Sequence, residues 1–87
     1  MSSPNVDIYT KFTCGFCHRA KHLLDSKNVS YNEFDISMGG ADKAEMLRRA
    51  PDVRTVPQIF IGDRHVGGSD DLAALESSGE LDRMLAG

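Results

Sequence analysis

The first forty residues alternate between strand-like and helix-like patterns, and this alternation constrains the fold most. Residues 6–10 are short and mix β-branched, aromatic and polar types around Ile8, which favours a strand. Residues 15–27 carry apolar side chains at helical spacing, and Asn28 is expected to end that helix. Residues 30–36 favour a second strand. A strand, a helix and a strand within about thirty residues predict a right-handed βαβ unit with parallel strands.

A second helix is predicted after a glycine pair. Gly39 and Gly40 interrupt the chain, and residues 41–50 then have a helical pattern that Pro51 ends, because proline cannot continue the helical hydrogen bonds. The residues expected to face inward are Ala44, Met46 and Leu47.

The last third predicts a hairpin and a final helix. Residues 58–61 and 64–66 flank a tight Gly62-Asp63 turn. Ser69 is expected to be the N-cap of the last helix, which Gly79 interrupts. The order β-α-β-α-β-β-α predicts an α/β protein in which a four-stranded mixed sheet is flanked by helices.

Composition limits the kind of protein. The chain has 87 residues, so residues 1–87 are expected to form one domain. A net charge of −3 and the lack of a basic block argue against nucleic acid as a partner. No apolar run approaches the roughly 20 residues that span a bilayer, and Met1–Asn5 lacks the features of a secretory signal. We therefore expect a cytoplasmic protein without a membrane partner.

The two cysteines form one C-x-x-C motif at the predicted strand-to-helix junction. In the reducing cytoplasm such a pair indicates catalysis or metal binding rather than a structural disulfide. The free N–H groups at a helix N-terminus stabilise a thiolate, and Lys11 adds positive potential, so Cys14 is the expected nucleophile. Cys17 lies one turn further into the helix and suits a resolving thiol.

Three other interpretations of the motif are weaker. A structural zinc site needs about four ligands, and the sequence has no second cysteine pair or suitably spaced histidine pair. With His18, the motif also matches the C-x-x-C-H sequence of covalent haem attachment, but strands and the absence of a signal peptide argue against it. Two inert buried thiols would leave their position at a helix start unexplained.

Three segments together resemble the glutaredoxin family, over nearly the whole chain. These segments are Lys11-Phe12-Thr13-Cys14-Gly15-Phe16-Cys17, Thr55-Val56-Pro57-Gln58 and Gly67-Gly68-Ser69-Asp70-Asp71. The resemblance is to bacterial dithiol glutaredoxins. It implies a thioredoxin-like fold, a cis peptide bond before Pro57, and a glutathione groove between the cysteine motif, the Pro57 loop and the start of the last helix.

The resemblance also implies roles for residues around that groove. The backbone at Thr55 and Val56 would pair with the cysteinyl part of glutathione, and the start of the last helix would hold its γ-glutamyl group. Lys11, Arg54 and Gln58 would face the glycyl carboxylate, whereas Phe16 fits either the core or a substrate-facing position. The expected glutathione-binding residues are Lys11, Phe16, Arg54, Thr55, Val56, Pro57, Gln58, Gly68, Ser69, Asp70 and Asp71.

The implied activity is glutathione-dependent thiol-disulfide exchange. The catalytic residues would be Cys14 and Cys17, and the partners would be glutathione and glutathionylated or disulfide-containing proteins. The protein is expected to be a monomer without a tightly bound cofactor. Gly15 and Phe16 replace the usual proline and tyrosine, which brings the motif within one residue of the monothiol Cys-Gly-Phe-Ser sequence. The alternatives are therefore a [2Fe–2S] carrier, in which two chains share a cluster through Cys14 and glutathione, and a thioredoxin proper.

Overall fold

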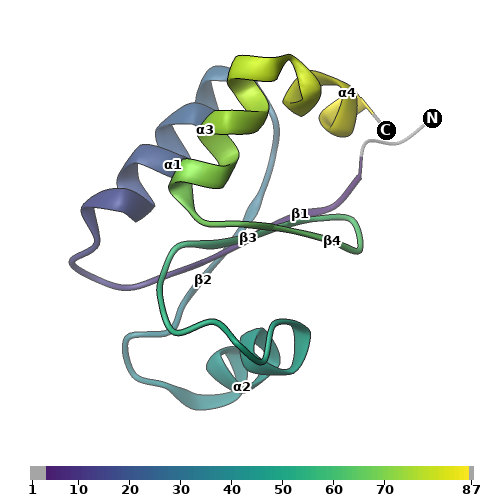
Figure 1. The fold of residues 1–87 in the computed structure, drawn as a ribbon. Coiled ribbons are helices and arrows are strands. Elements are labelled where there is room, and N and C mark those ends of the chain that lie inside the picture. Colours follow the sequence, from purple (N-terminus) through teal and green to yellow (C-terminus); the bar gives the residue numbers. More distant parts are fainter. Residues whose placement is uncertain (1–3, 87) are drawn as a thin grey trace.

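The computed structural model describes residues 4–86, which form a four-stranded sheet flanked by helices on both faces (Figure 1). The strands are β1 (Val6–Thr10), β2 (Asn32–Asp35), β3 (Gln58–Ile61) and β4 (Arg64–Gly67). Their order in the sheet is β2-β1-β3-β4. β1 runs parallel to β2 and antiparallel to β3, and β3 pairs antiparallel with β4, so the predicted mixed sheet is confirmed.

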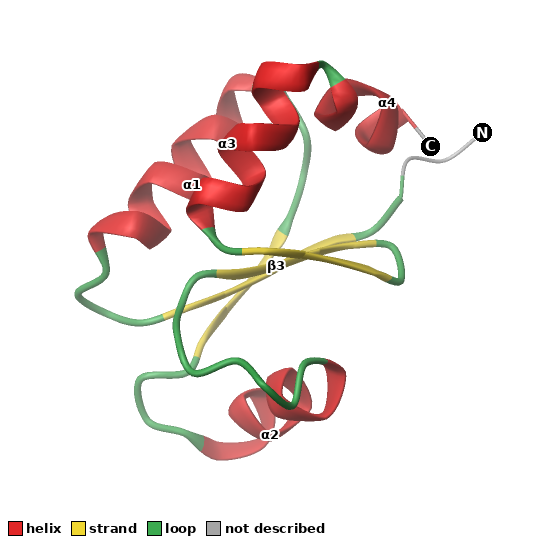
Figure 2. Ribbon diagram, viewed as in Figure 1, coloured by secondary structure: helices red, strands yellow, loops and turns green. Residues whose placement is uncertain are grey.

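The helices are divided unequally between the two faces of the sheet (Figure 2). α1 (Gly15–Ser26), α3 (Ser69–Ser78) and α4 (Glu80–Ala86) cover one face, and α2 (Gly40–Arg49) covers the other. α1 connects the parallel strands β1 and β2, as the first forty residues predict. This arrangement is the thioredoxin-like fold.

The face of the sheet beneath α1, α3 and α4 carries a cluster of buried apolar side chains. Its buried residues are Val6, Ile8, Ala20, Leu24, Ile59, Ile61, Leu72, Leu81 and Leu85. Removing such side chains from water is the main stabilising contribution to a fold of this size.

The face beneath α2 combines aromatic packing with a buried ion pair. The Tyr9 and Phe60 rings meet edge to face, with 5.8 Å between their centroids. The Arg49 guanidinium lies 3.9 Å from the Phe60 ring centroid and its Nη1 is 3.0 Å from Asp7 Oδ2. Asp7 Oδ1 also accepts hydrogen bonds from Asn5 and Asn32, so the buried carboxylate is fully partnered.

The prediction of which residues of α2 face inward is wrong in part. Met46 is buried, but Ala44 is exposed and Leu47 is 37% exposed. The helix instead turns Arg49 toward the sheet, since Asp7 and the aromatic rings provide partners for its charge. α2 begins at Gly40 and ends at Arg49, close to the predicted range.

Two helix ends follow the predicted breaks and one does not. Asn28 adopts a positive φ of 56° just after α1, and Gly79 at φ 81° separates α3 from α4. The N-cap of α3 is Gly68 rather than Ser69, because extended backbone at Gly68 starts the helix one residue earlier and leaves Ser69 buried in its first turn.

None of the helices within residues 4–86 is long and apolar enough to cross a membrane. Met1–Ser3, which carry part of the evidence against a signal sequence, and Gly87 lie outside the described residues.

Candidate active site

Cys14 is the N-cap of α1. Its Sγ accepts a hydrogen bond from the backbone N–H of Cys17 at 3.1 Å, in the position that a serine or aspartate oxygen takes in most helices. The first turn of α1 contains no acidic residue that would oppose the positive end of the helix dipole. The structure therefore places this sulfur at the start of the helix, as the sequence predicts.

Cys17 lies in a different environment although it is only three residues away. It is 1% exposed, whereas Cys14 is partly exposed, and both are free thiols. Burial, together with a hydrogen bond to the Cys14 sulfur, raises the pKa of Cys17 to about 12, although a backbone hydrogen bond with Lys11 acts in the opposite direction. Cys17 is thus protonated at neutral pH while Cys14 faces solvent.

The loop before β3 lies beside the nucleophile. The Val56–Pro57 peptide bond is cis, as the resemblance implies, and the Val56 carbonyl oxygen lies 3.7 Å from Cys14 Sγ. Thr55 and Val56 come directly before the cis bond and line the cavity next to the thiol. The loop therefore presents backbone to any molecule attached to Cys14.

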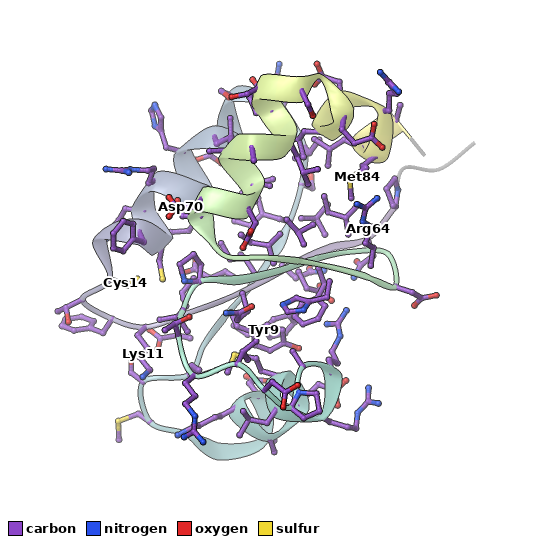
Figure 3. All side chains as sticks on the ribbon, viewed as in Figure 1. Tyr9, Lys11, Cys14, Arg64, Asp70 and Met84 are labelled. Atoms are coloured by element: carbon purple, nitrogen blue, oxygen red, sulfur yellow. The ribbon has the colours of Figure 1, made fainter. Side chains whose placement is uncertain are left out.

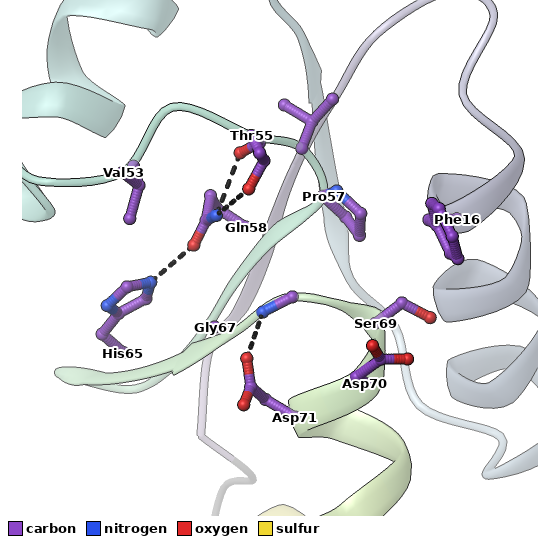
Figure 4. Close-up of a pocket in the computed structure, with 12 residues that line it drawn as sticks. Phe16, Val53, Thr55, Pro57, Gln58, His65, Gly67, Ser69, Asp70 and Asp71 are labelled. Carbon is purple, nitrogen blue, oxygen red and sulfur yellow. Dashed lines mark hydrogen bonds between the residues drawn. The ribbon is translucent and has the colours of Figure 1, made fainter.

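Gln58 holds this loop in place. Its Nε2 donates to the Thr55 carbonyl at 2.9 Å and contacts Thr55 Oγ1 at 3.4 Å, and its Oε1 lies 2.7 Å from His65 Nε2 (Figure 4). The side chain is only 4% exposed. Gln58 lines the cavity on the side of α3, away from Lys11 and Arg54, and the expectation that it faces the glycyl carboxylate stays a prediction.

A cavity of about 460 Å³ lies between the start of α1, the cis-proline loop and the start of α3 (Figure 4). We call it the acidic pocket, because Asp70 and Asp71 are the carboxylates in its wall. Its lining residues are Phe16, Val53, Thr55, Val56, Pro57, Gln58, His65, Gly67, Gly68, Ser69, Asp70 and Asp71. Phe16 is 56% exposed and lies under the Arg19 guanidinium, so it faces this cavity rather than filling the core.

The start of α3 offers both donors and an acceptor to the acidic pocket. The first intrahelical hydrogen bond runs from Leu72 N–H to Gly68 O, so the N–H groups of the preceding turn are available to an anion. Asp70 and Asp71 are both exposed, and Asp71 Oδ2 accepts a hydrogen bond from Gly68 N–H at 2.9 Å. Gly67 has φ 116°, and a Cβ there would collide with the Asp71 carboxylate, so this approach requires glycine.

A second cavity, of about 250 Å³, lies on the other side of Thr55 and Val56. We call it the basic pocket. Its lining residues are Lys11, Ile36, Lys43, Met46, Leu47, Val53, Arg54, Thr55 and Val56. The Thr55-Val56 backbone thus separates a cavity with carboxylates from one with cations, and the Cys14 sulfur lies beside that backbone.

The structure gathers the predicted site residues into two groups. Phe16, the Thr55–Gln58 loop and residues 68–71 meet in the acidic pocket, whereas Lys11 and Arg54 lie in the basic pocket. Figure 3 shows Cys14, Lys11 and Asp70 at the same end of the molecule. The sequence analysis did not list Val53, His65 and Gly67 among the residues of the acidic pocket. They are close in sequence to the Pro57 loop and to the start of α3, and this closeness could have indicated them.

No group of three or more histidine, cysteine or acidic side chains within residues 4–86 could hold a metal ion.

Comparison with known proteins agrees with this geometry. Residues 6–66 match the family model described as Glutaredoxin. The chain is 54% identical over 81 residues to Glutaredoxin 3 of Escherichia coli (strain K12), covering 93% of this chain and 96% of that protein. It superimposes on the solution structure of glutaredoxin from Brucella melitensis with a TM-score of 0.82 at 49% identity, covering 98% of this chain and 91% of that one.

The buckwheat glutaredoxin-glutathione complex is also similar, with a TM-score of 0.83 at 31% identity, over 95% of this chain and 77% of that one. The C-x-x-C motif at a helix start, the cis-proline loop beside it and these similarities together show that the chain belongs to the glutaredoxin family, and it is a thiol-disulfide oxidoreductase.

Proposed function

We propose that this protein reduces glutathione mixed disulfides and protein disulfides through Cys14 and Cys17, with glutathione as co-substrate. The observation that best supports this proposal is the position of the Cys14 sulfur. It lies at the N-cap of α1 and beside the Thr55-Val56 backbone, which separates the acidic pocket from the basic pocket. Glutathione has an ammonium and a carboxylate at its γ-glutamyl end and a second carboxylate at its glycyl end. The two cavities match this distribution of charge.

Glutathione is proposed to lie along the Thr55-Val56 backbone. Its cysteinyl part pairs with that backbone, in the manner of an added strand, which brings its sulfur to Cys14. The γ-glutamyl carboxylate binds the N–H groups at the start of α3, and its ammonium binds Asp70, since Asp71 already accepts a hydrogen bond from Gly68 N–H. The glycyl carboxylate lies toward Lys11 and Arg54 in the basic pocket.

Deglutathionylation needs only Cys14. Its thiolate attacks the glutathionyl sulfur of the mixed disulfide, a new disulfide forms between Cys14 and glutathione, and the old S–S bond breaks. The electron pair leaves on the substrate protein's sulfur, which takes up a proton. A second glutathione, as thiolate, then attacks the glutathionyl sulfur on Cys14, so that oxidised glutathione forms and the Cys14 thiolate is restored.

Reduction of a protein disulfide also needs Cys17. Cys14 forms a mixed disulfide with the substrate, and Cys17 attacks the Cys14 sulfur to release the second substrate thiol and leave an internal disulfide. The high pKa of the buried Cys17 keeps it as a thiol until then, so its proton must be lost during the attack. Two glutathione molecules then reduce the internal disulfide.

Two serine variants test this division. Cys14→Ser should abolish turnover of a small glutathione mixed disulfide and of a protein disulfide, because the nucleophile is lost. Cys17→Ser should retain the first activity and lose the second. The measurement is glutathione-dependent turnover, coupled to reduction of the oxidised glutathione produced. Equal loss of both activities in the two variants would overturn the assigned roles.

The iron–sulfur alternative needs ligands from outside the chain, since residues 4–86 hold no group of three metal-binding side chains. The space around Gly15 is open, with nothing within 4 Å of an added Cβ, which favours room for a group beside Cys14. A brown, dimeric protein after anaerobic purification with glutathione would support this alternative. Without a cluster we propose a cytoplasmic monomer, in which both thiols stay reduced.

A further inference from the structure

The basic pocket is larger and more apolar than the glycyl end of glutathione requires. Glycine has no side chain, yet the pocket has a hydrophobic wall formed by Ile36, Met46, Leu47 and Val53. Leu47 is 37% exposed, so part of this wall is open to solvent. The pocket also contains Lys43, a third cation from α2 beyond Lys11 and Arg54.

The cations of the basic pocket are free to bind a partner. None of the ion pairs among residues 4–86 involves Lys11, Lys43 or Arg54. The neighbouring arginines of α2 are different, because Arg48 pairs with Glu45 and Arg49 with Asp7. Three unpaired cations around an apolar wall form a surface complementary to an acidic segment that also carries an apolar side chain.

We propose that the basic pocket binds the residues that follow the reactive cysteine in a protein disulfide substrate, and that it selects an apolar residue next to an acidic one. This inference rests on the proposed function and adds a substrate class to it. Glycine follows cysteine in glutathione, so a protein segment bound in the same direction along Thr55 and Val56 sends its next residues into this pocket. An extended chain advances about 3.3 Å per residue, so the first two residues after the cysteine reach the pocket.

The test uses short peptides oxidised to symmetrical disulfides. Three peptides have Cys-Leu-Glu, Cys-Leu-Lys or Cys-Gly-Glu at their centre. The measurement is the second-order rate constant for oxidation of the reduced protein by each peptide. We expect the Leu-Glu peptide to react about tenfold faster than the Leu-Lys peptide and several-fold faster than the Gly-Glu peptide.

Two variants test the pocket itself. Lys43→Glu should reverse the preference for glutamate over lysine, and Leu47→Ser should remove the preference for leucine over glycine. Both residues are on the surface of α2, so neither change opens the core. In Leu47→Ser, turnover of the mixed disulfide between glutathione and 2-mercaptoethanol should stay within about twofold, because that substrate places no apolar side chain in the pocket. In Lys43→Glu the same turnover should fall, because the glycyl carboxylate of glutathione lies in the same pocket, so the preference between the peptides, not the rate alone, is the readout for this variant.

Arg64→Glu is the matched control for charge. Arg64 pairs with Ile61 at the hairpin turn, and Ile61 pairs with Val6, the first residue of β1. Cys14 comes shortly after the other end of β1, which is Thr10. Figure 3 accordingly shows Arg64 and Cys14 at opposite ends of the molecule. Arg64→Glu should leave the peptide preferences unchanged.

Equal rate constants for the three peptides with the unmodified protein would overturn the inference, as would an equal effect of Lys43→Glu and Arg64→Glu. Failure of the proposed function gives a different result. In that case the glutathione mixed disulfide is not turned over at all, whatever the peptides show.

Discussion

The two faces of the sheet are stabilised by different interactions. Beneath α1, α3 and α4 lies a cluster of nine buried apolar side chains, whereas beneath α2 a smaller apolar cluster lies beside a guanidinium that stacks on Phe60 and pairs with Asp7. The nucleophile and the start of α3 belong to the apolar face. The cis-proline loop and the basic pocket belong to the α2 face. Cys14 therefore lies on the side of the larger apolar cluster, and the basic pocket lies on the side of the ion pair.

The largest expected effect tests this difference by removing one buried side chain from each face. Leu24→Ala should lower the free energy of unfolding by about 3 kcal/mol, because Leu24 is fully buried among several elements and leaves a cavity. Met46→Ala should cost about 2 kcal/mol, since the single helix α2 can move to fill part of the space. Urea unfolding measures both values, and a larger loss for Met46→Ala would contradict the comparison.

The ion pair gives the next largest effect. Asp7→Val should cost about 2 kcal/mol, because it leaves the Arg49 guanidinium, only 19% exposed, without its carboxylate. Arg49→Met should cost about 1 kcal/mol, since Asp7 keeps hydrogen bonds from Asn5 and Asn32. The double variant should lose less stability than the sum of the two single variants in a double-mutant cycle. Simple additivity would show that the pair is not coupled.

Cys17 should make the stability of the reduced protein depend on alkaline pH. Its pKa is about 12 in the folded protein and 9.0 in the unfolded reference, so folding favours the protonated thiol. The resulting stabilisation is complete below pH 9 and is lost as the pH rises toward 12. Between pH 8 and pH 10 the loss should be about 1 kcal/mol. Urea unfolding at several pH values should show a smaller loss in Cys17→Ser, and identical pH profiles would exclude this contribution.

Gly15→Pro should have the smallest effect and should stabilise the protein. Gly15 is the first residue of α1, a position that suits proline, and Cys14 before it has φ −118° and ψ 107°, as a residue preceding proline requires. The gain should be about 0.5 kcal/mol, through lower entropy of the unfolded chain. Gly79→Ala is the control, because its position is equally open but has a positive φ, so it should destabilise. Destabilisation by Gly15→Pro would mean that this helix start needs glycine.

Much of the fold could be predicted because its signals are local. The helical spacing of Ala20 and Leu24, the glycines at helix ends and the order of the elements all lie within short stretches of sequence. The position of Cys14 at a helix start follows from the same local pattern. The cis bond before Pro57 came from the family resemblance, since an isolated proline would more commonly mark an ordinary turn.

The errors came from residues whose surroundings are built by distant parts of the chain. Arg49 looks like a surface residue of α2 in the sequence, and only the aromatic rings and Asp7 of the sheet make it a buried one. Gln58 and His65 are seven residues apart, on two strands, and the hairpin brings them together. Ser69 has the chemistry of an N-cap, but the backbone of Gly68 determines where α3 begins.

The assignment of Cys14 as the nucleophile is tested most directly by alkylation of the reduced, folded protein with iodoacetamide, followed by peptide mapping. At pH 7 Cys14 should be modified and Cys17 should not, because a pKa of about 12 leaves only about one Cys17 in 10⁵ as thiolate. Comparable labelling of Cys17, or no labelling of Cys14, would contradict the assignment.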